Sequence, residues 1–215
     1  MIPGEDACCI LLYGDIGEYS DVTAAAIVRE LMEAEASGKR IDVRINSNGG
    51  DVYTGIAIFN ALRGSKADIH IYVDGIAASM ASVIALCGKP VEMSKYARLM
   101  LHSVSGGCYG NKTELRRCLE EVEALENTLC EMYAPRLGTS VEEIRARYFD
   151  DADHWLKADE ALSLGFIDGV YDADPVPEDS TPEQVYRIFN NRLEQRLNDT
   201  QMNLEEVKKR PIEEI

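Results

Sequence analysis

The sequence predicts an α/β domain built on a mainly parallel sheet, and two observations lead to this fold class. Short apolar runs alternate with helix-like segments through the first half of the chain, as expected when crossover helices connect parallel strands. The chain has 215 residues and 46% apolar content, which suffices for one domain with a sizeable core.

Strands and helices are expected in alternation in the first half of the chain. The strands are predicted in ACCILLYGDI, RIDVRIN, DIHIYVDG and ARLMLHSV, and the third of them is expected to end at Gly75. Helices are predicted at 23–36, 52–62 and 79–87, and in the first two the apolar residues gather on one face. Gly38 follows the first helix as a stop signal.

The second half begins with the glycine-rich stretch SGGCYGNK and continues with a long predicted helix. Asn111 and Glu114 have the spacing of a capping box. A helical apolar stripe then runs to about residue 134, which corresponds to roughly six turns. Two further helices are predicted in TSVEEIRARY and KADEALSLG, and a closing strand is predicted in FIDGVYD.

The composition changes after Asp172. The stretch ADPVPEDSTPEQ combines three prolines with several acidic residues, a composition typical of a linker. Residues 184–198 have the pattern of an amphipathic helix. We therefore expect a folded domain at 1–172 and a C-terminal extension at 173–215.

The charge of the chain limits its partners. Lys and Arg total 22 against 38 Asp and Glu, so the formal net charge is -16, which argues against binding to nucleic acid. No apolar run approaches the ~20 residues needed to cross a bilayer. The N-terminal stretch MIPGEDACCILLYG carries acids where an export signal needs bases, so a cytoplasmic location is expected, with no membrane partner.

The six cysteines show no C-x-x-C spacing and no histidine at zinc-ligand distance. In a reducing compartment they are predicted to be free thiols. No metal and no cofactor is expected. The cysteines are Cys8, Cys9, Cys87, Cys108, Cys118 and Cys130.

The stretch VDGIAASMAS places Ser79 after a predicted strand and at the start of a predicted helix. Unpaired N–H groups and the helix dipole at such a junction favour developing negative charge, so Ser79 is a candidate nucleophile and the Met80 amide a candidate oxyanion donor. The motif is not G-x-S-x-G. The alternative is a helix start whose small residues pack against another backbone, with Ser82 a packing residue, and the stretch alone favours it.

The stretch NSNGGD forms a second strand-to-helix turn. Gly49 and Gly50 allow the backbone to turn its amides toward a bound group, although an ordinary tight turn would use the same residues. In parallel sheets, ligands bind beyond the carboxyl ends of the strands, where both turns are expected.

A serine nucleophile needs a general base, and the chain has three histidines. His70 lies inside a predicted strand and His154 in an acidic loop, so structural or solvated roles are expected for both. His102 ends the strand ARLMLH at the edge that carries the glycine turns and suits the base, with a core or capping role as the alternative. The orienting carboxylate is left open between three candidates, which are Asp150, Asp151 and Asp153.

With these residues in place, the chain resembles the ClpP family of serine peptidases from about residue 10 to 170. RINSNGGDVYTGIAIFNAL is similar to the family's INSPGG turn and helix, VDGIAASMAS to its G-x-AASM segment, and ARLMLH to its R-x-M-I-H strand. DADHWLKADEALSLGFID is similar to ERDxFLSAxEAxEYGLID. The resemblance implies Ser79 as nucleophile, His102 as base and Asp153 as third triad member, with Gly49 and Met80 amides in the oxyanion hole.

The resemblance also implies a ClpP/crotonase-type fold in which SGGCYGN forms a glycine-rich strand that pairs with extended substrate, followed by a long handle helix. It further implies a homo-oligomer of heptameric rings, stacked as a tetradecamer around a chamber that receives protein or peptide substrates. The implied substrate-binding residues are Gly50, Ser105, Gly106, Gly107 and Cys108.

Three features depart from the family pattern. Asn48 stands where the glycine turn usually has proline, the segment before the first strand is short, and an acidic extension follows the domain. The short N-terminus predicts that the axial loops are absent, which leaves an ATPase partner uncertain. Phage-encoded relatives share the short N-terminus and the tail, which favours a head-maturation protease acting on capsid or scaffold protein. The alternatives are a catalytically dormant assembly component and a crotonase-like acyl-CoA enzyme.

Overall fold

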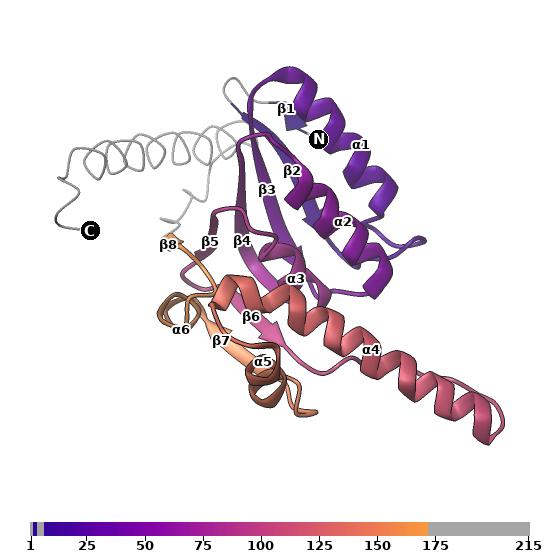
Figure 1. The fold of residues 1–215 in the computed structure, drawn as a ribbon. Helices are drawn as coiled ribbons and strands as arrows, with labels where there is room; N and C mark the ends of the chain where they lie inside the picture. The colour runs from indigo at the N-terminus through magenta and orange to yellow at the C-terminus, as the bar shows by residue number, and fades with distance from the viewer. Residues whose placement is uncertain (1, 4–6, 172–215) are drawn as a thin grey trace, which may run out of the picture. The chain divides into compact units, whose positions relative to one another are not determined.

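The computed structural model describes residues 2–3 and 7–171 of the chain (Figure 1). The predicted boundary after residue 172 and the predicted helix at 184–198 lie outside the described residues. The strands are β1 (Ile2–Pro3), β2 (Ala7–Tyr13), β3 (Arg40–Ser47), β4 (Ile69–Ala78), β5 (Val91–Ser94), β6 (Arg98–Leu101), β7 (His154–Lys157) and β8 (Gly169–Tyr171). The helices are α1 (Ala24–Ser37), α2 (Val52–Gly64), α3 (Met80–Ala85), α4 (Lys112–Leu137), α5 (Val141–Tyr148) and α6 (Ala158–Ser163).

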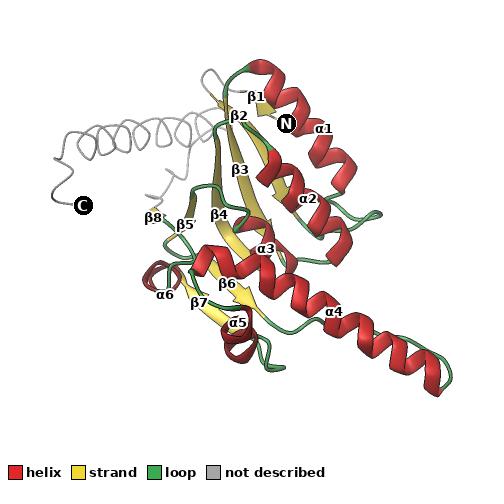
Figure 2. Ribbon diagram, in the orientation of Figure 1, coloured by secondary structure: helices red, strands yellow, loops and turns green. Residues whose placement is uncertain are grey.

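The strands form one sheet in the order β1-β2-β3-β4-β5-β8, and β6 and β7 extend it at the far end of β4. All pairings are parallel except β1 with β2 and β6 with β7. Helices connect the parallel strands and lie against the sheet (Figure 2). The predicted α/β fold with a mainly parallel sheet is therefore confirmed.

Strand β4 differs from its prediction because it continues beyond Gly75 to Ala78. Two strands share its second edge, β5 pairing with Ile71–Val73 and β6 pairing with Ile76–Ala78. The backbone groups after Gly75 thus find a new partner strand, and pairing continues up to the start of α3. The strands β1, β5 and β7 were not predicted.

The core lies between the sheet and the helices α1 and α2, which lie side by side across strands β2 to β4 (Figure 1). Alternate side chains of β3 and β4 point into it, and those of Val43, Ile45, Ile71 and Val73 are fully buried. Burial of each such side chain contributes about 1.5–3 kcal/mol relative to exposure. This packing holds the central strands, and with them the turns at their carboxyl ends, in one register.

Helix starts and stops follow the sequence signals closely. The Thr23 side chain caps α1, Asp51 caps α2, and Gly38 ends α1 in the left-handed region with φ 69°. Asn111 and Glu114 form the predicted capping box at the start of α4. Each side-chain cap stabilises a helix start by about 1 kcal/mol. Helix α4 runs to Leu137, slightly beyond its predicted end near residue 134.

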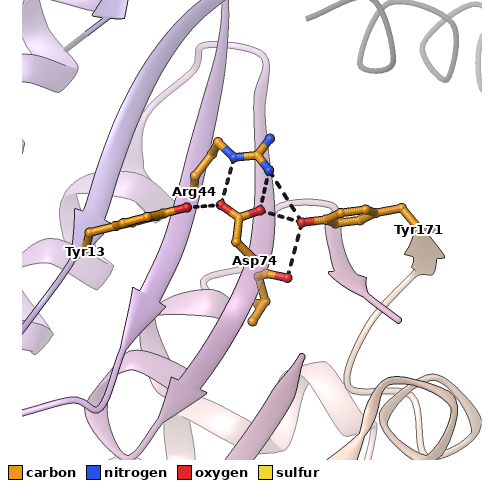
Figure 3. Close-up of polar contacts among 5 residues, drawn as sticks. Tyr13, Arg44, Asp74 and Tyr171 are labelled. Carbon is orange, nitrogen blue, oxygen red and sulfur yellow. Dashed lines mark hydrogen bonds and ion pairs between the residues drawn. The ribbon is translucent and has the colours of Figure 1, made fainter. Parts of the chain in front are cut away.

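The other face of the sheet carries an ion pair at the point where β4 changes partner (Figure 3). Asp74 Oδ2 accepts from Arg44 Nε at 2.8 Å and from the Tyr13 hydroxyl at 2.6 Å. The Tyr171 hydroxyl donates to Asp74 Oδ1, and burial raises the pKa of both tyrosines above their ordinary value. The register between β3 and β4 shifts just beyond, between Ile45 and Ser47. The network thus connects β2, β3, β4 and β8 next to this irregularity.

None of the helices in the described part of the chain is long and apolar enough to cross a membrane.

Candidate active site

Ser79 occupies the junction between β4 and α3 in an unusual backbone conformation. Its φ is 52° and its ψ is -127°, a region that costs a non-glycine residue about 1–3 kcal/mol. Hydrogen bonds hold it there, since the Ser79 N–H donates to the Met100 carbonyl at 2.9 Å. The Ser79 carbonyl accepts from the Ser82 hydroxyl at 2.6 Å. The sharp turn therefore belongs to the fold and presents the side chain at the end of the sheet.

Ser82, expected to be a packing residue, is fully buried and also makes hydrogen bonds. Its hydroxyl lies 2.7 Å from the hydroxyl of Tyr133 on α4, while it donates to Ser79. Burial raises the pKa of Tyr133 above its ordinary value, so the phenol stays neutral in this contact. A buried chain of hydrogen bonds thus connects the Ser79 backbone to helix α4.

His102 follows directly after β6 and reaches Ser79. Its Nε2 lies 2.8 Å from Ser79 Oγ, within hydrogen-bond distance. Because β6 pairs with the end of β4, Ala78 lies opposite Met100. Ser79 and His102 therefore follow the ends of two adjacent strands and lie beside each other. The imidazole is half-buried. A neutral imidazole in this position can accept the serine proton as a general base.

Asp153 lies close to His102 along the backbone, but its carboxylate is exposed to solvent. The antiparallel register of β6 and β7 ends with Leu101 opposite His154, so His102 and Asp153 are the next pair in sequence. Within the described residues, no hydrogen bond joins the two side chains. The third position of the triad therefore stays a prediction.

The other two acidic candidates have different partners. The Asp150 carboxylate lies 2.7 Å from His154 Nε2, and this hydrogen bond lowers the pKa of Asp150. The Asp151 N–H donates to the Ser103 hydroxyl at 3.0 Å. His154 is half-buried and stacks edge-on against Tyr148, so its predicted solvated position is wrong. The strand pairing of β7 with β6 brings His154 against the helix α5.

Gly49 packs directly against the serine turn. A Cβ added to it would lie 2.8 Å from Ser79 Cβ and 2.9 Å from the Met80 nitrogen, and its φ is 97°. Only glycine fits this conformation at this distance. The Gly49 N–H donates to the Ser47 hydroxyl at 3.1 Å. Met80 is the first residue of α3, so its N–H has no acceptor within the helix.

Gly50 packs against a second segment that sequence reasoning did not single out. A Cβ on Gly50 would lie 2.1 Å from the Ile16 carbonyl oxygen, and the Asp51 N–H donates to the same oxygen at 2.8 Å. The Ile16 N–H in turn donates to the Gly49 carbonyl at 2.9 Å. The glycine turn is thus fixed on both sides, by Ile16 and by the serine turn, although Asn48 takes the place of proline.

Comparison with known proteins agrees with this geometry. The family model described as Clp protease matches residues 7–174. The chain belongs to the Clp protease family. It is therefore a peptidase, which makes a crotonase-like acyl-CoA enzyme the wrong alternative.

Two relatives illustrate the similarity. The chain is 32% identical over 157 residues to the ATP-dependent Clp protease proteolytic subunit of Bacteroides fragilis, covering 71% of this chain and 75% of the relative. It is 35% identical over 158 residues to the ATP-dependent Clp protease proteolytic subunit 1 of Prochlorococcus marinus subsp. pastoris, covering 72% of this chain and 80% of the relative.

In this member of the Clp protease family, a small cavity opens beside the serine. Its volume is about 60 Å³. Ser79, His102 and Gly50 contribute to its wall together with residues of α4 and of the loop after α5. Leu129 belongs to the apolar stripe predicted for the long helix, but that stripe alone did not indicate a contribution to the site. The apolar lining residues are Val52, Met80, Val83, Val104, Leu129, Tyr133 and Phe149.

The glycine-rich stretch after His102 does not form a strand in the single chain. Residues 102–109 have no strand assignment in the described structure, and Ser105, Gly106, Gly107 and Cys108 are exposed. The glycine-rich strand implied by the family resemblance is therefore absent here. Its backbone groups need a partner strand, and the described part of the chain offers none.

The prediction of six free thiols is wrong for one pair. Cys108 and Cys118 form a disulfide, with their Cα atoms 6.5 Å apart. The chain reverses at the Asn111 cap, so the residues before it lie back along α4 and bring the two cysteines together. The remaining cysteines Cys8, Cys9, Cys87 and Cys130 are free. In the described residues, no three His, Cys, Asp or Glu side chains gather in a way that would hold a metal ion.

Proposed function

We propose that this peptidase is a serine endopeptidase with Ser79 as nucleophile and His102 as general base. The observation that carries the proposal is the 2.8 Å contact between Ser79 Oγ and His102 Nε2, at a serine whose backbone is held in a strained turn. Strained conformations persist only where the surrounding fold supports them, and they cluster at active sites, where the strain is part of the mechanism. A serine needed only for packing has no use for this conformation.

The proposed reaction is acyl transfer in two steps. Ser79 Oγ attacks the carbonyl carbon of the scissile peptide bond while His102 Nε2 takes its proton. The imidazolium then gives this proton to the leaving amine, and an acyl-enzyme remains. In the second step, water attacks the ester with His102 again as base, which releases the acid and regenerates Ser79.

The tetrahedral intermediate needs donors for its oxyanion, and the amides of Met80 and Gly49 are proposed for this role. The Met80 N–H is free of an intrahelical acceptor, and Gly49 packs against the same turn. The Gly49 N–H donates to the Ser47 hydroxyl in the unliganded chain. We propose that this bond is exchanged for the oxyanion, which is the stronger acceptor because it carries charge.

Asp153 is proposed as the residue that orients His102. Its backbone is next to that of His102 in the register of β6 and β7, so a rotation of the side chain is the smallest change that would bring the carboxylate to Nδ1. Asp150 is less suited because its carboxylate is already hydrogen-bonded to His154, and Asp151 lies two residues further than Asp153 from the end of the β6–β7 pairing. The exposed side chain of Asp153 leaves room for this rotation.

Substrate is proposed to bind as an extended peptide along residues 105–108, with Gly50 on the opposite side of the serine. The exposed backbone of this stretch has free donors and acceptors for a strand-like partner. The cavity beside Ser79 is small and has both polar and apolar residues in its wall, which favours a small side chain next to the scissile bond.

Assembly into rings is proposed from the exposed surface of α4. The N-terminal half of this helix extends away from the sheet (Figure 1) and exposes Leu115 and Leu119 by 47% and 57%. An apolar stripe of this kind is typical of an interface with other copies. By the family resemblance, we propose heptameric rings stacked in pairs, with the active sites facing an internal chamber.

The phage setting is proposed from the composition of residues 173–215, which are rich in acids and carry several prolines. Capsid or scaffold protein is the proposed substrate, and the extension itself is a candidate for cleavage. Intact mass spectrometry of the full chain and of Ser79→Ala tests whether the extension is cleaved. Loss of part of the extension in the wild type alone is expected, and full-length masses for both proteins after prolonged incubation would contradict it.

The nucleophile is tested by labelling with a fluorophosphonate. The wild type is expected to incorporate one label per chain, and Ser79→Ala none. Ser163→Ala, which changes an exposed serine on α6, is the matched control and is expected to label as the wild type does. Labelling that survives in Ser79→Ala would sink the assignment. Absence of label in the wild type would favour the dormant assembly component.

A further inference from the structure

Residues 104–111 lie back along α4 and contact it at three points. The Val104 N–H donates to Glu126 Oε1 at 3.0 Å, and the Asn111 N–H donates to Glu114 Oε2 at 2.7 Å. Between these two contacts, Cys108 is bonded to Cys118. As the stretch advances, its partners step back along the helix. Residues 104–111 therefore follow the helix surface, and the disulfide joins the two in the middle.

We propose that Cys108 and Cys118 are a thiol–disulfide modification site that sets the affinity of this peptidase for its substrate. The inference rests on the proposed function, because it assumes that peptide binds along residues 105–108. Neither cysteine belongs to the Ser79–His102 pair. The small-molecule partner is a thiol and its disulfide, of the class to which glutathione belongs.

A small thiol in solvent can reach the Cys108–Cys118 pair more readily than the buried free cysteines. Cys108 is exposed and Cys118 is half-buried. Three of the four free cysteines are buried, and these are Cys8, Cys87 and Cys130. Disulfides in reducing compartments are usually transient and act in redox sensing or catalysis. A small thiol can reach Cys108 without any opening of the core.

The chemistry is thiol–disulfide exchange in two steps. In the reducing direction, a small thiolate attacks one sulfur of the protein disulfide, the S–S bond breaks, and the leaving protein thiolate takes up a proton. A second small thiolate then attacks the mixed disulfide and releases the small disulfide together with the second protein thiol. The protein gains two electrons and two protons, which two small thiols supply. Oxidation is the same sequence in reverse.

The disulfide restricts the stretch that is proposed to hold substrate. Gly106, Gly107 and Gly110 have no side chains to limit their backbone, so this stretch loses much conformational entropy when it is ordered. With the bond closed, the ordering is present before substrate arrives. With the bond open, the contacts at Val104 and Asn111 remain, and substrate binding must order the residues between them. Reduction is therefore expected to weaken binding.

The chemical step is expected to respond much less. Ser79 and His102 are positioned by the pairing of β4 with β6 and by the bond to the Met100 carbonyl, all outside the stretch. Opening of the disulfide leaves these contacts unchanged. The oxidised and reduced forms should thus differ in KM and agree in kcat.

The bond itself is tested by peptide mapping of the full chain. The protein is equilibrated with defined ratios of oxidised to reduced glutathione, alkylated and digested. The expected result is a linked peptide pair containing Cys108 and Cys118 at high ratios, which is replaced by two alkylated peptides at low ratios. Alkylation of both cysteines at every ratio, or linkage of either to another cysteine, would overturn the proposal.

The effect of the disulfide on substrate binding is tested by kinetics with a fluorogenic peptide amide that has alanine or leucine before the scissile bond. Reduction is expected to raise KM by about tenfold, the size expected when a few residues must be ordered on binding, with kcat within twofold. Cys118→Ser is expected to show the high KM in both conditions. Cys9→Ser, which changes a free cysteine on β2, should respond to reduction as the wild type does. An unchanged KM on reduction of the mapped bond would overturn the proposal.

Fluorophosphonate labelling separates this proposal from the proposed function. Ser79 in Cys118→Ser is expected to label at the wild-type rate, because the reagent is small and does not need the glycine-rich stretch. If the wild type does not label, the proposed function fails while the mapping still decides whether the bond exists. If labelling is normal and KM ignores the redox state, only the present inference fails.

Discussion

The two regions that flank His102 are held in very different ways. On its N-terminal side, β6 pairs with the end of β4, and Ser79 is fixed by hydrogen bonds to Met100 and Ser82. On its C-terminal side, residues 105–109 are exposed and have no partner strand within the described chain. The comparison indicates a division of labour, in which the sheet positions the reacting groups and the exposed stretch receives the substrate.

A similar contrast exists within the sheet itself. The side chains of β3 and β4 on the helix-covered face are apolar and buried, whereas the opposite face carries the ion pair of Arg44 and Asp74 with two tyrosine hydroxyls. Apolar packing is tolerant of direction, but an ion pair with four donors fixes one geometry. The network lies beside the register shift of β3 and β4, where a slip would displace Ser79.

The largest expected effect comes from His102→Ala, which tests the sheet-held side of the comparison. Removal of the base should lower the rate of peptide cleavage by about 10⁶ if serine and histidine act as a unit. The fluorophosphonate labelling rate should fall in parallel. His70→Ala, which changes a half-buried histidine at the opposite end of β4 from Ser79, is the control with near-normal rates. Equal labelling rates in His102→Ala and wild type would refute the assignment of the base.

Asp153→Asn should lower kcat by about 10⁴, because the amide cannot hold the imidazole in the tautomer that accepts the serine proton. Asp151→Asn is a matched control two residues away, since asparagine tolerates the positive φ of 66° at that position. Steady-state kinetics with the fluorogenic peptide measure both variants. A larger loss in Asp151→Asn than in Asp153→Asn would show that the third position is assigned to the wrong carboxylate.

Gly49→Ala should lower kcat by about 10²–10³, because the added Cβ displaces the backbone N–H of residue 49 and so has the effect of losing one oxyanion donor. The added Cβ would meet Ser79 and Met80 below 3.0 Å, so the two turns must separate. Gly64→Ala is the control, because a Cβ at Gly64 meets no atom within 4 Å. Circular dichroism verifies folding, and a folded Gly49→Ala with normal kcat would exclude Gly49 from the oxyanion hole.

The smallest effect on catalysis is expected from Asp74→Asn, which acts on stability. Loss of the charge leaves Arg44 in a site where its side chain is 14% exposed, and breaking such a pair costs about 3 kcal/mol. Urea unfolding followed by circular dichroism measures this change, with exposed Asp159→Asn as control. The kcat per folded chain should stay within tenfold. A variant as stable as the wild type would show that the ion pair adds nothing to the fold.

Much of the fold follows from local signals. The caps at Thr23, Asn111 and Ser140 and the glycine stop at Gly38 define helix ends because they act within one turn of the chain. The end of β4 did not follow from such signals. Gly75 looked like a strand end, but the strand continues because β6 offers a second partner, which no local pattern records.

The candidate site shows the same difference between local sequence signals and tertiary contacts. The sequence by itself determined which residue types carry the chemistry, since Ser79, His102 and the glycine pair stand at strand ends and match the motifs of one family. Only the tertiary structure decided their distances, the contact of Gly49 with the serine turn, the exposure of Asp153, and the bond between Cys108 and Cys118. The physical reason is the separation along the chain between the residues that interact. Strand ends and caps depend on neighbouring residues, whereas these contacts depend on strand pairing and on how the chain reverses against α4.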